Sequence, residues 1–146
     1  MRPGELHERH RAALPAWLSL YYERPIELVR GEGFRVWDSE GNEYLDFFGG
    51  IVTTISGHAV PEIVEAVKEQ AERILHSSIL YLIESQVRLA EKLISLSPIS
   101  GEQKVFFVGS GSEANEAALL FATQYRGSSE VIALRGSYHG GSFGTM

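Results

Sequence analysis

Residues 104–125 read KVFFVGSGSEANEAALLFATQY, and this stretch decides how the rest of the chain is interpreted. A short apolar run rich in β-forming residues, 105–108, stops at Gly109, where the turn Gly-Ser-Gly-Ser (109–112) begins. Apolar side chains then recur every three or four positions, at Ala114, Ala117, Ala118, Phe121, Ala122 and Tyr125. This spacing places them on one face of a helix. The stretch therefore predicts a strand, a tight glycine turn and an amphipathic helix.

The turn at 109–112 is a candidate anion site. Backbone N–H groups in the first turn of a helix lack partners, and the helix dipole adds roughly half a positive charge there. Gly111 would let a bulky anion approach the backbone, and Ser110 and Ser112 supply hydroxyl donors, so a phosphate ester fits. A serine before a helix is also a common N-cap, however, and a turn glycine needs no ligand. Taken alone, the turn favours this plainer interpretation, since it matches neither the dinucleotide fingerprint nor the P-loop.

A second motif favours the anion site over the plain helix cap. The run VGSGSEANE (108–116), followed by RGSYHGG (135–141), resembles the class III aminotransferases, which are fold-type I enzymes that use pyridoxal phosphate (PLP). The resemblance extends from about residue 25 to the end of the chain. It implies an α/β fold, with an N-terminal segment (1–60) that carries a β-hairpin and a substrate loop. Residues 61–146 would then be the first part of the large PLP-binding domain and its sheet, which contains parallel strands, incomplete at the C-terminus.

Composition excludes several classes of function. The chain has 146 residues, of which 44% are hydrophobic and 22% charged, as expected of one folded domain. A net charge of −6 without a basic stripe argues against a nucleic-acid partner, and no apolar run approaches the ~20 residues that span a bilayer. The charged N-terminus is not a secretory signal. The absence of cysteine excludes disulfides and thiolate chemistry, and it fits a cytoplasmic location.

Local patterns predict the remaining elements. A helix over 6–21 is interrupted at Pro15, and 34–47 forms a hairpin around the turn formers at 39–42. Amphipathic spacing predicts helices over 61–75 and 84–96, and residues 130–134 look like a short buried strand. With the strand at 105–108, this suggests a βαβ unit and a parallel sheet. Both motifs then follow strands, so both should lie at the ligand-binding edge of that sheet.

The resemblance assigns roles to individual residues. The amides of Gly111 and Ser112 and the Ser112 hydroxyl would hold the PLP phosphate, with Ser110 assisting. Tyr138 would stack on the pyridine ring, and His139 would pack near the cofactor. Without the family, these two residues are an aromatic pair that ends a strand. Ile51 would line the substrate pocket, although residues 49–54 could equally be a plain buried strand, and His58 is expected to be structural.

No catalytic residue is expected in this chain, and no metal ligand set is predicted. Its three lysines, Lys68, Lys92 and Lys104, lie on polar helix faces or before a strand, where nothing would lower their pKa for Schiff-base formation. The resemblance places the catalytic lysine downstream of residue 146. The chain is therefore interpreted as the N-terminal portion of a longer or split protein, inactive by itself.

The implied reaction moves an amino group from an amino acid to a 2-oxo acid. Gly141 stands where many family members carry an arginine, which weakens a 4-aminobutyrate or ornithine specificity. Residues 44–53, 76–78 and 135–140 look closest to the alanine–glyoxylate type. Alternatives are another class III PLP enzyme (a 4-aminobutyrate aminotransferase, an ornithine aminotransferase or an aminomutase) or a non-catalytic phosphate-binding module. The family implies a homodimer, and a C-terminal half supplied by another chain is the other possibility.

Overall fold

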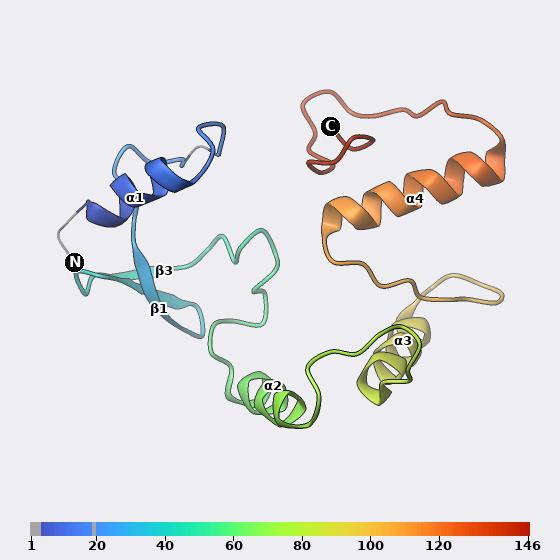
Figure 1. Cartoon of the computed structure of the whole chain (residues 1–146), viewed down its shortest axis with the longest axis horizontal. Coiled ribbons are helices and arrows are strands. Elements are labelled where there is room, and N and C mark those ends of the chain that lie inside the picture. The colour runs from blue at the N-terminus through green and yellow to red at the C-terminus, as the bar shows by residue number, and fades with distance from the viewer. Residues whose placement is uncertain (1–3, 19) are drawn as a thin grey trace. The chain divides into compact units, whose positions relative to one another are not determined.

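The computed structural model describes residues 4–18 and 20–146, which form two compact units (Figure 1). The first unit runs to Ser77, and the second is Ser78–Met146. The predicted division after residue 60 came from the family resemblance and stays a prediction.

A three-stranded antiparallel sheet forms the centre of the first unit. Its strands are β1 (Leu28–Glu32), β2 (Arg35–Asp38) and β3 (Glu43–Leu45), in the order β1-β2-β3. The β2–β3 pair is the predicted hairpin, with Val36 opposite Tyr44. Strand β1 was not predicted, because its sequence LVRGE lacks a clear alternation. Val36, 6% exposed, is the one apolar side chain that is buried among the residues the structure describes.

Asp38 organises the hairpin turn. Its Oδ1 accepts from the amides of Glu40 (3.0 Å) and Asn42 (2.8 Å), while its Oδ2 accepts from Asn42 Nδ2 (2.9 Å) and the Tyr44 hydroxyl (2.7 Å). The Asn42 side chain has the largest effect, and together these donors lower the pKa of Asp38 to about 2, because they stabilise the charged carboxylate. The turn residues predicted from the sequence are thus held in place by hydrogen bonds to the Asp38 carboxylate.

The N-terminal helix is shorter than predicted. Helix α1 spans Glu5–Ala13, and Leu14 is already extended (φ −111°, ψ 152°). The prediction of a helix continuing to residue 21 was therefore wrong. Pro15 explains the end, because the residue before a proline is driven out of the helical conformation.

Residues 49–56 form consecutive turns, so the alternative of a buried strand was wrong. Ile51 and Val52 have φ of 58° and 72°, which β-branched residues adopt at a cost in strain. Asp46 holds the start of this loop, since its Oδ1 accepts from the amides of Phe48 and Gly49, both at 2.9 Å.

Asp46 also ties the loop to its far end. Its Oδ2 lies 2.7 Å from His58 Nε2, and this bond is the main reason why the pKa of Asp46 is lowered. The backbone of His58 pairs with Gly33 in an antiparallel bridge, which brings the imidazole against the sheet. The structural role expected for His58 agrees with this geometry.

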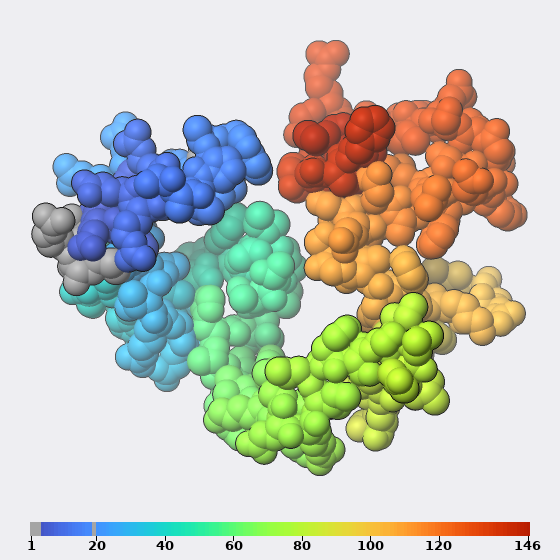
Figure 2. Space-filling model, viewed as in Figure 1, coloured from blue at the N-terminus to red at the C-terminus, as the bar shows by residue number. Residues whose placement is uncertain are grey.

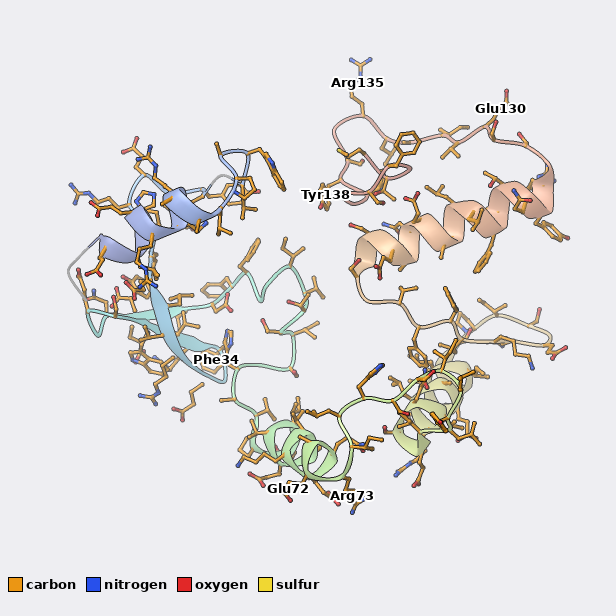
Figure 3. The ribbon with its side chains drawn as sticks, viewed as in Figure 1. Phe34, Glu72, Arg73, Glu130, Arg135 and Tyr138 are labelled. Atoms are coloured by element: carbon orange, nitrogen blue, oxygen red, sulfur yellow. The ribbon has the colours of Figure 1, made fainter. Side chains whose placement is uncertain are left out.

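Two amphipathic helices follow with the predicted character. Helix α2 spans Pro61–Arg73, two residues shorter than expected, and α3 spans Glu84–Leu96 as predicted. Glu72 and Arg73 lie on the polar face of α2 (Figure 3). Neither helix buries a residue, and among the described residues neither packs on another element. Their apolar faces are formed but uncovered.

The predicted parallel strands are absent from the described residues. Segments 105–108 and 130–134 run as irregular chain on either side of helix α4 (Gly111–Arg126), so the βαβ unit is not formed (Figure 1). A strand requires a neighbour for its backbone N–H and C=O groups, and neither segment has a ladder partner in the described part of the chain. Ile132 is consequently 100% exposed. These segments have the apolar composition of strands, but no neighbouring strand in the described residues pairs with them.

Candidate cofactor site

Helix α4 begins with a reciprocal cap. The N-cap residue is Ser110, whose Oγ accepts from the amide of Glu113 at 3.2 Å. The Glu113 carboxylate folds back and accepts from the amide of Gly109 at 2.6 Å. This arrangement resembles a capping box and explains why the helix starts at Gly111. The plainer interpretation of Ser110, as a helix cap, is therefore what the geometry shows.

The cap leaves two amides of the turn without acceptors. Among the described residues, neither Gly111 N–H nor Ser112 N–H donates a hydrogen bond. A Cβ added at Gly111 would meet no atom of another segment within 4 Å, so the space beside Gly111 is open. Because the helix dipole is positive at this end, the two amides form a place where a phosphate would be stabilised.

The second motif lies directly against this turn. The amide of Gly141 donates to Ser112 Oγ at 3.0 Å, and Asn115 Nδ2 donates to the carbonyl of His139 at 2.6 Å. Gly140 approaches so closely that a Cβ there would lie 2.7 Å from Ser112 Oγ. The two motifs therefore meet as predicted, although side chains of α4 join them rather than the edge of a parallel sheet. Figure 2 shows the red atoms of the chain end touching the orange atoms of α4.

The Ser112 hydroxyl keeps its donor function. A serine hydroxyl has one proton to donate and two lone pairs that accept. Since Ser112 Oγ accepts from Gly141, its own proton remains available to a ligand oxygen. Ser112 can therefore link the second motif and a phosphate at the same time.

The aromatic ring of Tyr138 is exposed to solvent beside this contact. Its side chain is 84% exposed, and its hydroxyl lies 3.9 Å from the position of a Cβ at Gly141 (Figure 3). Tyr138 thus folds back toward the residue that bonds Ser112, with its ring uncovered. The side chain of His139 is exposed, whereas its backbone carbonyl accepts the hydrogen bond from Asn115.

Sequence reasoning missed Glu116. Its Oε2 accepts from Ser142 Oγ at 2.6 Å, and the amide of Gly144 lies 3.2 Å from both of its carboxylate oxygens. Glu116 follows Ser112 by four residues and so lies on the same face of α4. That spacing was visible in the sequence, but the partner segment 26 residues away was not.

The three lysines are all exposed, and two of them are paired with glutamates. Lys68 pairs with Glu65 (2.7 Å) and Lys104 with Glu102 (2.8 Å), and both ion pairs are exposed. Lys92 is exposed on α3. Ile51 belongs to the first unit, is 73% exposed, and its role in substrate binding stays a prediction.

Residues 4–18 and 20–146 contain neither a metal-binding cluster nor a membrane-spanning helix. This part of the chain contains no group of three or more His, Cys, Asp or Glu that could hold a metal ion. None of its helices is long and apolar enough to cross a membrane.

Comparison with known proteins decides the family. The family model described as aminotransferase class-III matches residues 21–146. The chain belongs to the class III aminotransferases. PLP is the cofactor of this family, and the resemblance seen in the two motifs is thereby confirmed.

Curated relatives give the finer comparison. The chain is 44% identical over 129 residues to acetylornithine aminotransferase of Methanopyrus kandleri, covering 88% of this chain and 33% of that protein. It is 46% identical over 135 residues to acetylornithine aminotransferase of Caldanaerobacter subterraneus, covering 88% and 34%. A succinylornithine transaminase of Salmonella paratyphi A is 42% identical over 133 residues, covering 87% and 32%. The chain thus spans about a third of the length of these relatives.

Solved structures confirm the α/β fold of this class. An omega-transaminase from Sphaerobacter thermophilus superposes with a TM-score of 0.85 at 32% identity, over 97% of this chain and 32% of that one. A phospholyase from Arthrobacter, in complex with phosphoethanolamine, gives 0.82 at 36% identity, over 94% and 32%. Taurine:2-oxoglutarate aminotransferase from Bifidobacterium kashiwanohense, in complex with PLP and glutamate, gives 0.75 at 29% identity, over 87% and 28%.

Proposed function

We propose that this chain supplies the phosphate- and ring-binding part of a PLP site in an aminotransferase. The observation that carries the proposal is the contact between Ser112 Oγ and the amide of Gly141, beside two unpaired amides and an exposed aromatic ring. Two segments far apart in the sequence meet at the positive end of a helix, where an aromatic phosphate ester would find donors and a flat surface.

Each residue has a defined task in this proposal. The amides of Gly111 and Ser112 donate to phosphate oxygens, and the Ser112 hydroxyl donates its remaining proton. Tyr138 packs its ring on the pyridine, and His139 borders the cofactor. Ser110 assists by capping the helix, which fixes the direction of the two amides. Bound PLP supplies the electron sink that amine transfer requires.

The chemistry also requires a lysine, which we place outside this chain. The three lysines present are exposed, and two are already paired with glutamates. By this proposal, the 146-residue chain binds part of the cofactor but does not transfer amines alone. A cytoplasmic location and a homodimer, or a C-terminal half supplied by another chain, belong to the same proposal.

Two classes of amino donor are supported by different observations. The relatives described above are named acetylornithine aminotransferase and succinylornithine transaminase, which favours an N-acylated ornithine. Gly141, where many family members carry an arginine, weakens a 4-aminobutyrate or ornithine specificity, and the runs at 44–53, 76–78 and 135–140 look closest to the alanine–glyoxylate type. Rates measured with N-acetylornithine and 2-oxoglutarate, and with alanine and glyoxylate, separate the two.

Cofactor uptake tests the proposal. A protein that continues this chain through the catalytic lysine is expected to bind PLP and to absorb visible light. Ser112→Ala and Tyr138→Ala should each weaken PLP binding, on the order of tenfold for one lost hydrogen bond or one lost stacking contact. Gln124→Ala is the control, because Gln124 lies on the same helix, twelve residues beyond Ser112. A wild-type protein that stays colourless with added PLP would contradict the proposal.

A further inference from the structure

One face of α4 contacts the second motif and the residues directly after it at several points. Ser112, Asn115 and Glu116 are spaced by three and four residues, so their side chains project from the same side of the helix. Each contacts the segment 139–144, which lies 24 to 29 residues further along the chain. The helix thus presents a row of polar groups to one short stretch of backbone.

Asn115 and Glu116 act at the two ends of this stretch. Asn115 Nδ2 donates to the His139 carbonyl at 2.6 Å, next to Tyr138. Glu116 accepts from the Ser142 hydroxyl at 2.6 Å and meets the amide of Gly144 at 3.2 Å. Between these anchors the chain bonds to Ser112, so its position is set on both sides of that contact.

The Glu116 anchor is reinforced from within the segment. Thr145, 6% exposed, lies with its Oγ1 2.6 Å from Ser142 Oγ and accepts from the amide of Ser142 at 3.1 Å. The hydroxyl that bonds Glu116 is therefore held in a compact turn rather than on a free loop end. Hydrogen bonds to a carboxylate are stronger than hydrogen bonds to a neutral acceptor.

We propose that Asn115 and Glu116 are positioning residues, which hold residues 139–144 against α4 so that Tyr138 and Ser112 face one ligand. This inference rests on the proposed function, because the ligand is the cofactor. Neither side chain needs to touch it. Without these anchors, the Gly141 contact would have to order the whole segment alone, and the Tyr138 ring would lose its fixed direction.

Conservative substitutions, compared with one truncation, test the inference most sharply. Asn115→Asp keeps the shape of the side chain but removes the donor to His139. Glu116→Ala removes the acceptor, whereas Glu116→Gln keeps one carbonyl oxygen that accepts from Ser142. We expect PLP binding to weaken on the order of tenfold in Asn115→Asp and Glu116→Ala, and to recover in part in Glu116→Gln. Glu72→Ala, on the polar face of α2, controls for the loss of a negative charge.

The circular dichroism of bound PLP distinguishes positioning from plain stability. This visible band depends on how the ring is oriented, so a displaced Tyr138 should change its intensity even when PLP saturates the protein. Ser142→Ala removes the Glu116 contact from the other side. If the contact is what matters, Ser142→Ala added to Glu116→Ala should cause little further loss.

A readout without cofactor separates this inference from the proposed function. Fluorotyrosine NMR of the protein without PLP, assigned with Tyr138→Phe, should show the Tyr138 signal shifted in Glu116→Ala and restored in Glu116→Gln. If wild type binds no PLP, the proposed function fails, while this signal still reports on the anchors. If the signal, the band and the affinity are the same in wild type, Asn115→Asp and Glu116→Ala, the inference is overturned.

Discussion

Gly140→Ala should break the contact between the two motifs. A methyl group at this position would lie 2.5 Å from Thr145 Oγ1, 2.7 Å from Ser112 Oγ and 3.0 Å from Ser112 Cα. Ordinary contact begins at 3.4 Å, and Ser112 Cα belongs to the helix backbone, which cannot swing aside as a side chain can. Residue 140 must therefore retreat by at least the 0.4 Å difference between 3.0 and 3.4 Å. The 3.0 Å bond from Gly141 to Ser112 Oγ would be stretched or lost.

Two costs add at Gly140. Its φ of 144° is a conformation that an alanine adopts only with strain, of order 1–3 kcal/mol. A lost hydrogen bond adds about 0.5–1.5 kcal/mol. Even about 2 kcal/mol in total would weaken PLP binding about 30-fold if the site must be restored before the cofactor binds.

Equilibrium dialysis of PLP with the complete protein measures this effect. Gly127→Ala is the matched control, because Gly127 also has a positive φ (62°) but a methyl group there meets no atom within 4 Å. It caps the opposite end of α4, so it should lower stability while leaving PLP affinity within about twofold. Equal PLP affinity in Gly140→Ala and Gly127→Ala would refute the reasoning.

Three further predictions concern the local structure. Asp38, whose pKa is lowered to about 2, stabilises the hairpin fully above about pH 4, and this contribution is lost as pH falls through about 2. Circular dichroism should show this pH dependence of stability in the wild type and not in Asp38→Asn. Ser110→Ala should destabilise α4 by about 1 kcal/mol, seen as faster amide exchange in its first turn, whereas Ser110→Asp should preserve protection. Gly31→Ala would place a Cβ 2.6 Å from the His58 side chain and so displace the imidazole from Asp46. Because the bond to His58 is the main cause of the lowered pKa of Asp46, that pKa should rise toward its ordinary value in a carboxyl NMR titration. An unchanged pKa would show that His58 adapts without losing its bond.

The elements that depend on neighbouring residues could be predicted from the sequence. Helix α3 has the predicted bounds, and α4 begins after Ser110 because the cap is built from residues within one turn. The hairpin of β2 and β3 likewise depends on turn formers that bond Asp38. In each case the hydrogen-bond partners lie within a few positions, so the local pattern carries the information.

Contacts between distant segments required the tertiary structure. The segments 105–108 and 130–134 look like strands, but a strand exists only with a partner, and the described residues provide none. The sequence showed two motifs of one family, and the structure showed that Asn115 joins them while Glu116 holds the residues directly after the second motif. The physical reason is that periodicity records which face a residue occupies, whereas a hydrogen bond across 24 or more residues depends on where the intervening chain leads.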